Sequence, residues 1–229
     1  MIVICYSFEQ YTKLGEYHKV NKIENQDYIY SQENKEALFF AVADGVSSCK
    51  NSRAGAEIAC KVSAKVILND VDYYFASKPE KTIRLLLSNI KSEIHNTAII
   101  LNQEPISFAS TLCFACINKQ SGKIMLFVLG DSKIYCINKS NISQINRVQS
   151  YGENITCSTM TQHCETDARL ELKTINCDDV FLLCTDGCWK TLFKTDDNRI
   201  AMLEENIDYI DRFLDKKTIN DDCSYILIA

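Results

Sequence analysis

The sequence contains no stretch in which basic residues predominate. A protein that binds the phosphate backbone of a nucleic acid needs such a stretch. Its 229 residues include 25 lysines and arginines against 30 aspartates and glutamates, and the formal net charge is −5. No apolar segment approaches the length that spans a bilayer, and the short apolar run at residues 1–7 lacks a basic flank and a cleavage pattern. We therefore expect a soluble, unprocessed protein that binds neither nucleic acid nor membrane.

Internal repeats and low-complexity linkers are also missing from the sequence. A chain of 229 residues can bury enough apolar surface to stabilise one domain without disulfides or a structural metal. We therefore predict a single domain over residues 1–229.

Cysteine, by contrast, is abundant, with 12 residues. Cys113 and Cys116 form a C-x-x-C pair, but the sequence has no second pair that would complete a zinc site. Both lie in an apolar run that predicts a strand, in which the two thiols would point to opposite faces. We expect reduced and mostly buried cysteines, which are typical of a cytoplasmic protein.

Apolar runs of strand length, rich in Phe, Val, Ile or Tyr, recur along the chain. They occupy residues 37–43, 111–118, 123–129, 133–137, 180–184 and 224–228. The short segment 119–122 joins the second run to the third and ends in Gly122, where a positive φ suits a tight turn. These two runs are therefore predicted to form an antiparallel hairpin.

Helical periodicity appears at residues 52–69 and 80–101, between the first strand and the hairpin, and again at residues 203–216. Strands in hairpins, with helices inserted as a block, indicate an α+β architecture of two antiparallel sheets covered by helices. The stretch 140–176 is polar and poorly periodic, so we expect irregular loops there.

Four aspartates stand at the end of an apolar strand or in a tight turn beside one: Asp27, Asp44, Asp186 and Asp221. Each alone has a structural explanation, because Asp-Gly is a common turn dipeptide. Carboxylates gathered from distant parts of a chain repel one another unless cations neutralise them. Oxygen ligands without imidazole or thiolate favour Mg²⁺ or Mn²⁺, and two such ions suit the hydrolysis of phosphoesters.

The motifs around these residues resemble those of the metal-dependent (type 2C) Ser/Thr protein phosphatase family, in the family's order and over nearly the whole chain. The matching segments are residues 22–27 (KIENQD), 40–46 (FAVADGV), 109–112 (ASTL), 129–133 (LGDSK), 181–189 (FLLCTDGCW) and 221–224 (DDCS). The resemblance implies an αββα sandwich with its site in a cleft at one end of the sheets. It also implies a phosphoprotein substrate and a cognate kinase or regulator encoded separately.

By the family's pattern, Asp44 bridges two metal ions. The Gly45 carbonyl and Asp27 would complete the ligands of one ion, and Asp186 and Asp221 those of the other. Asp44 and Asp186 would thereby be catalytic residues as well as ligands.

Asp131 is similar to the family aspartate that, with Asp186, helps to hold a weaker third ion. On turn statistics alone, capping a turn between two strands is an equally good explanation of Asp131. A one-residue slip between Asp221 and Asp222 also stays open.

Two positions depart from the family's pattern. Lys22 stands five residues before Asp27, where the family usually has an arginine that grips the substrate phosphate. Lysine keeps the charge but loses the bidentate geometry, and a solvated surface lysine explains the residue equally well. Cys49 follows Ser47 and Ser48 where the family commonly has a histidine that is proposed to protonate the leaving group, so we expect water to supply that proton.

The resemblance thus implies hydrolysis of phosphoserine or phosphothreonine by water activated on two, or three, Mg²⁺ or Mn²⁺ ions. One alternative is a catalytically weak or inactive pseudophosphatase that acts as a partner-binding regulatory module, which the two departures favour. Another is a hydrolase of small phosphate esters.

Overall fold

The structure is a computed structural model that describes residues 6–138, 141–145, 157–196, 199–204 and 206–229. Within these ranges the strands form two five-stranded antiparallel sheets and a two-stranded ribbon. The first sheet contains, in spatial order, β1 (Phe8–Lys13), β12 (Cys223–Ile228), β9 (Val180–Cys184), β6 (Lys133–Asn138) and β7 (Asn141–Ile145). The second contains β2 (Tyr28–Glu33), β3 (Ala37–Ala43), β4 (Leu112–Asn118), β5 (Lys123–Leu129) and β8 (Arg169–Thr174). The ribbon pairs β10 (Phe193–Asp196) with β11 (Arg199–Met202).

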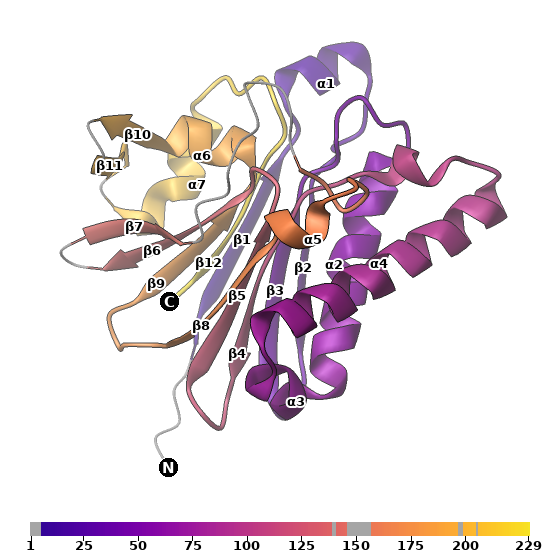
Figure 1. The fold of residues 1–229 in the computed structure, drawn as a ribbon. Helices are drawn as coiled ribbons and strands as arrows, with labels where there is room; N and C mark the ends of the chain where they lie inside the picture. The colour runs from indigo at the N-terminus through magenta and orange to yellow at the C-terminus, as the bar shows by residue number, and fades with distance from the viewer. Residues whose placement is uncertain (1–5, 139–140, 146–156, 197–198, 205) are drawn as a thin grey trace.

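Helices cover the outer face of each sheet, and the layers are visible in Figure 1. The second sheet is covered by α2 (Ser52–Asn69) and α4 (Pro79–Leu101), with α3 (Val71–Ala76), η1 (Pro105–Phe108) and α5 (Cys164–Asp167) beside them. The first sheet is covered by α6 (Asp186–Leu192), η2 (Ile207–Tyr209) and α7 (Ile210–Asp215), and α1 (Glu16–Asn21) lies at one end of the sandwich. No helix in the described ranges combines the length and the apolar composition that a membrane crossing requires.

The hydrophobic core consists of three layers, one between the sheets and one under each set of helices. Every residue of β4 is buried, because both faces of this strand are covered. Phe114 faces α2 and α4 and stacks on Phe127 of β5, with ring centroids 5.0 Å apart. Ala115 and Ile117 face the other sheet. The predicted αββα sandwich is therefore confirmed.

Most of the predicted elements are found. The strands predicted from apolar runs correspond to β3, β4, β5, β6, β9 and β12, and the two longest predicted helices to α2 and α4. The β4–β5 hairpin is confirmed, with Gly122 at a φ of 64°.

Two predictions are wrong. The stretch 140–176 is not simply loops, because it contributes β7, α5 and β8, although residues 146–156 lie outside the described ranges. The helix predicted at 203–216 begins later: the N–H of Leu203 donates to the carbonyl of Leu192, which extends the ribbon pairing. The helical turns start at Ile207, where the Asn206 side chain accepts a hydrogen bond from the N–H of Asp208.

The C-x-x-C pair lies on β4 as predicted, and its thiols face different core layers. Cys113 lies between the sheets, whereas Cys116 lies under the helices. Burial raises the pKa of Cys116 to about 12, so its reactive thiolate is scarce at neutral pH.

We therefore predict that brief alkylation of the native protein modifies exposed Cys177 and leaves Cys113 and Cys116 untouched until the protein is unfolded. Mass spectrometry of the resulting peptides provides the measurement, with Cys177 as the internal control. A disulfide between Cys113 and Cys116, or their modification in the native protein, would contradict the placement of this strand.

Candidate metal centre

Two of the predicted aspartates meet at one end of the second sheet. β2 begins at Tyr28 and β3 ends at Ala43, and these two residues pair across the antiparallel ladder. Asp27 comes directly before Tyr28, and Asp44 directly after Ala43. The strand register therefore brings Asp27 and Asp44 together, and the charge of Asp27 acts on Asp44.

The first sheet contributes the other aspartates at the same end of the sandwich. Cys184, the last residue of β9, pairs with Lys133 at the start of β6 and with Tyr225 near the start of β12. The segments beside these strand ends carry the remaining candidate ligands, Asp131, Asp186 and Asp221. All of them lie within electrostatic range of Asp44, so the predicted aspartates form one group.

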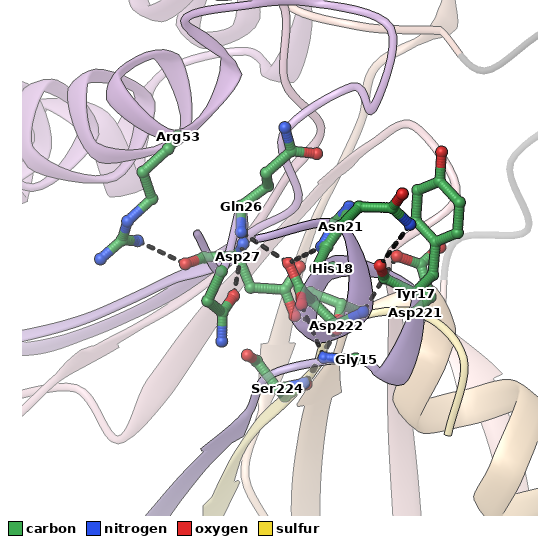
Figure 2. A network of polar contacts seen from close by, with 12 residues as sticks. Gly15, Tyr17, His18, Asn21, Gln26, Asp27, Arg53, Asp221, Asp222 and Ser224 are labelled. Carbon is green, nitrogen blue, oxygen red and sulfur yellow. Dashed lines mark hydrogen bonds and ion pairs between the residues drawn. The ribbon is translucent and has the colours of Figure 1, made fainter. Parts of the chain in front are cut away.

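Asp27 is buried, with 3% of its surface exposed. Its Oδ2 accepts a hydrogen bond from Thr185 Oγ1 at 2.8 Å, and its main-chain carbonyl accepts one from the Arg53 guanidinium, which Figure 2 shows. Its Oδ1 is buried and has no hydrogen-bond partner among the described residues. A bare carboxylate oxygen is unfavourable in the interior unless a cation coordinates it, so Oδ1 fits a metal ligand.

Asp186 has the same division between its two oxygens. It is the first residue of α6 and is 7% exposed. Its Oδ2 lies 2.6 Å from the ammonium nitrogen of Lys190, while Oδ1 is buried without a hydrogen-bond partner in the part of the chain that the structure describes. Asp186 therefore offers a second bare oxygen to a cation.

Three carboxylates of this group, Asp27, Asp44 and Asp221, resist ionisation when no metal is bound. Burial raises the pKa of Asp27 to about 8, from an ordinary value of 3.8, and the nearby Asp186 charge adds to the effect. Burial and the charge of Asp27 raise the pKa of Asp44 well above its ordinary value. Burial and the charge of Asp186 likewise raise the pKa of Asp221. Cations would remove this mutual repulsion.

The main chain at Gly45 runs unusually close to the start of α2. A Cβ atom at Gly45 would lie 2.8 Å from the Cβ of Ser52, so a larger residue does not fit without a shift. The Gly45 N–H donates to the carbonyl of Gln26 at 3.2 Å, and the N–H of Thr111 donates to the carbonyl of Asp44 at 2.7 Å. These bonds fix the backbone beside Asp44, while ligation by the Gly45 carbonyl stays a prediction.

Asp222, unlike Asp221, is fully engaged by the protein (Figure 2). Its Oδ1 accepts the N–H of Gly15 at 2.9 Å, and its Oδ2 accepts the N–H of Gln26 at 2.6 Å. The same Oδ2 pairs with Nδ1 of buried His18 at 2.8 Å. Asp222 therefore joins α1, the start of β2 and the start of β12, which supports Asp221 as the ligand.

Lys22 and Cys49 remain outside this group of carboxylates. Lys22 follows the last turn of α1 with a φ of 56°, and its side chain is exposed. The thiol of Cys49 donates to the carbonyl of Ile106 at 3.4 Å, so its proton is already engaged. Contact between Lys22 and a substrate phosphate stays a prediction.

Three residues near the site did not emerge from the sequence: His18, Arg53 and Lys190. Lys190 carried a readable signal, because it lies four residues after Asp186 and a helix places such residues on one face. His18 and Arg53 carried none, since their partners, Asp222 and the Asp27 carbonyl, are distant in sequence or belong to the main chain.

The donor set fits Mg²⁺ or Mn²⁺, because it consists of carboxylate and carbonyl oxygens. It includes Oδ1 of Asp27 and Oδ1 of Asp186, which are buried and find no hydrogen-bond partner within the described ranges. In the described residues, no three side chains of His, Cys, Asp or Glu are already grouped as the ligands of a single ion. The carboxylates thus share one end of the sandwich, and ion binding would have to draw them closer.

The helix-covered double sheet, with the motif aspartates at one end, defines the class of type 2C phosphatases. A family model described as Protein phosphatase 2C matches residues 14–221. The chain therefore belongs to this family, which makes it a protein phosphatase by descent. No curated protein sequence matches the chain.

Solved structures share the fold over almost the whole chain. A bacterial serine phosphatase has a TM-score of 0.71 at 17% identity, with 98% of each chain covered. The serine/threonine phosphatase Stp1 from Staphylococcus aureus has a TM-score of 0.69 at 16% identity, with 99% of this chain and 95% of that one covered. RsbX in complex with magnesium has a TM-score of 0.63 at 15% identity, with 97% and 94% covered. At these identities the likeness shows the fold.

The separate roles of the two adjacent aspartates lead to a prediction. Asp222→Ala leaves buried donors unpaired, so we expect it to lower the free energy of unfolding by about 3–5 kcal/mol. Asp221→Ala should change that free energy by less than about 1 kcal/mol and instead weaken Mn²⁺ binding. Urea denaturation without metal and a Mn²⁺ titration measure the two effects. A larger loss of stability for Asp221→Ala would contradict this assignment.

Proposed function

We propose that this protein hydrolyses phosphoserine and phosphothreonine in other proteins, using two Mg²⁺ or Mn²⁺ ions. Asp44 would bridge the ions, with Asp27 and the Gly45 carbonyl on one side and Asp186 and Asp221 on the other. The observation that carries this proposal is that Asp27 Oδ1 and Asp186 Oδ1 are buried and have no hydrogen-bond partner in the part of the chain that the structure describes. Family membership supplies the reaction class.

The chain's own residues would hold the site in shape. The Thr185 hydroxyl donates to Oδ2 of Asp27, which leaves Oδ1 for an ion. The Thr111 hydroxyl accepts the N–H of Asp44 at 2.8 Å, so this residue is fixed from both sides of its main chain. The bound ions would supply the positive charge that activates water and stabilises the phosphoryl oxygens.

The metal ligands would not themselves attract the substrate phosphate or protonate the leaving group. The exposed Lys22 ammonium would attract the substrate phosphate as a point charge. Because the Cys49 thiol donates to a main-chain carbonyl, water would protonate the departing serine or threonine oxygen.

A cavity beside Asp221 supports a protein substrate over a small ester. It has a volume of about 550 Å³ and lies between α1, Ser47 and Asn220. Exposed Tyr17 and Val20 of α1 line it, and they offer apolar contacts to residues that flank a phosphorylated side chain. A small phosphate ester would leave this space unused.

The cellular setting is part of the proposal. All cysteines in the described ranges are free thiols, which supports a reducing, cytoplasmic location. A phosphatase of this kind implies a kinase or regulator encoded separately, and residues 1–229 would act as one phosphatase domain.

We predict that turnover of a phosphothreonine peptide requires Mn²⁺ or Mg²⁺ and falls on the order of 100-fold or more in Asp44→Asn. Asp72→Asn, on the exposed surface of α3, serves as the matched control and should keep full activity. Because Asn cannot ionise, while burial and neighbouring charges oppose the ionised form of Asp44, metal-free Asp44→Asn should melt no lower than the wild type. Folded wild-type protein that shows no turnover with either ion would contradict the proposal and favour a partner-binding module.

A further inference from the structure

The ammonium of Lys190 occupies one side of the candidate metal centre. α6 begins at Asp186, so Lys190 lies one helical turn later on the same face. Its Nζ lies 2.6 Å from Oδ2 of Asp186, the oxygen opposite the bare Oδ1. Asp186 thus presents one oxygen to a lysine and keeps the other for a metal ion.

The same turn of α6 is tied to the loop that carries Asp131. The indole N–H of Trp189 donates to the main-chain carbonyl of Asp131 at 2.8 Å. The ammonium of Lys133 lies over the Trp189 ring at 3.2 Å from the centroid, and that of Lys190 at 5.6 Å. The carboxylate of Asp131 lies within electrostatic range of Lys190. Lys190 therefore belongs to the region shared by Asp131 and Asp186.

The family resemblance assigns a weak third metal ion to that region. An ammonium and a divalent cation repel each other, and the Lys190 ammonium already occupies Oδ2 of Asp186. The residues present therefore fit two ions and do not fit a third.

We propose that the Lys190 ammonium supplies the positive charge beside Asp186 and Asp131 that a third metal ion would otherwise supply, so that the centre binds two ions. This inference rests on the proposed metal centre, and it makes Lys190 a positioning residue for Asp186. If Lys190 has this role, the enzyme needs only the two ions of higher affinity for full activity.

The stoichiometry of Mn²⁺ binding tests the inference without reference to activity. Electron paramagnetic resonance of free Mn²⁺ counts the bound ions up to millimolar concentration. We expect two for the wild type and for Lys190→Arg, and an additional weaker third ion for Lys190→Ala. Lys65→Ala, an exposed lysine on α2, is the matched control and should bind two. Three ions bound to the wild type, or no gain in Lys190→Ala, would overturn the inference.

Turnover provides a second readout that separates this inference from the proposed function. At Mn²⁺ concentrations that fill two sites, Lys190→Ala should lose roughly tenfold or more of its activity, and Lys190→Arg should retain it. Raising Mn²⁺ to millimolar levels should restore Lys190→Ala, because the ion replaces the lost charge. If millimolar Mn²⁺ does not restore the activity of Lys190→Ala, the inference is overturned. A wild type that binds two ions yet shows no turnover would instead contradict the phosphatase proposal.

Discussion

The main physical constraint on this structure is the crowding of carboxylates at one end of two packed sheets. Burial and mutual repulsion disfavour the ionised forms of Asp27, Asp44 and Asp221. Oδ1 of Asp27 and Oδ1 of Asp186 lie buried without hydrogen-bond partners among the described residues. A fold that needed only stability would have filled these positions with apolar or paired side chains. The unfavourable arrangement would become favourable if cations entered, and this is the physical argument for the proposed metal centre.

Hydrogen bonds of Asp222 and Thr185 hold together the end of the sandwich that carries these carboxylates. Asp222 joins three segments through Gly15, Gln26 and buried His18, so the chain entering β2 and the chain entering β12 keep a fixed separation. Thr185 fixes the orientation of Asp27 from the opposite sheet. The candidate ligands therefore lie beside strand ends that these hydrogen bonds hold in place.

The sequence predicts the parts of this molecule that local pattern determines. Strands buried on both faces, such as β4, read as continuous apolar runs, and α2 and α4 have clear helical periodicity. β8 was missed because it is an edge strand whose residues are largely polar, with exposed Lys173 and Thr174. The sequence favoured Asp221 as the ligand but left a slip to Asp222 open, because the difference between them lies in His18 and main-chain partners some two hundred residues away. The order of the motifs identifies the candidate ligands, but only the fold shows that they lie close together.

The most direct test of the account is anomalous diffraction from crystals soaked in Mn²⁺. The account predicts two strong peaks at the end of the sandwich, with Asp44 between them and the bare oxygens of Asp27 and Asp186 facing one ion each. It also predicts that the Lys190 ammonium stays beside Asp186. Mn²⁺ bound only elsewhere, or a single ion held without Asp44, would contradict the claim that these carboxylates form a two-metal centre.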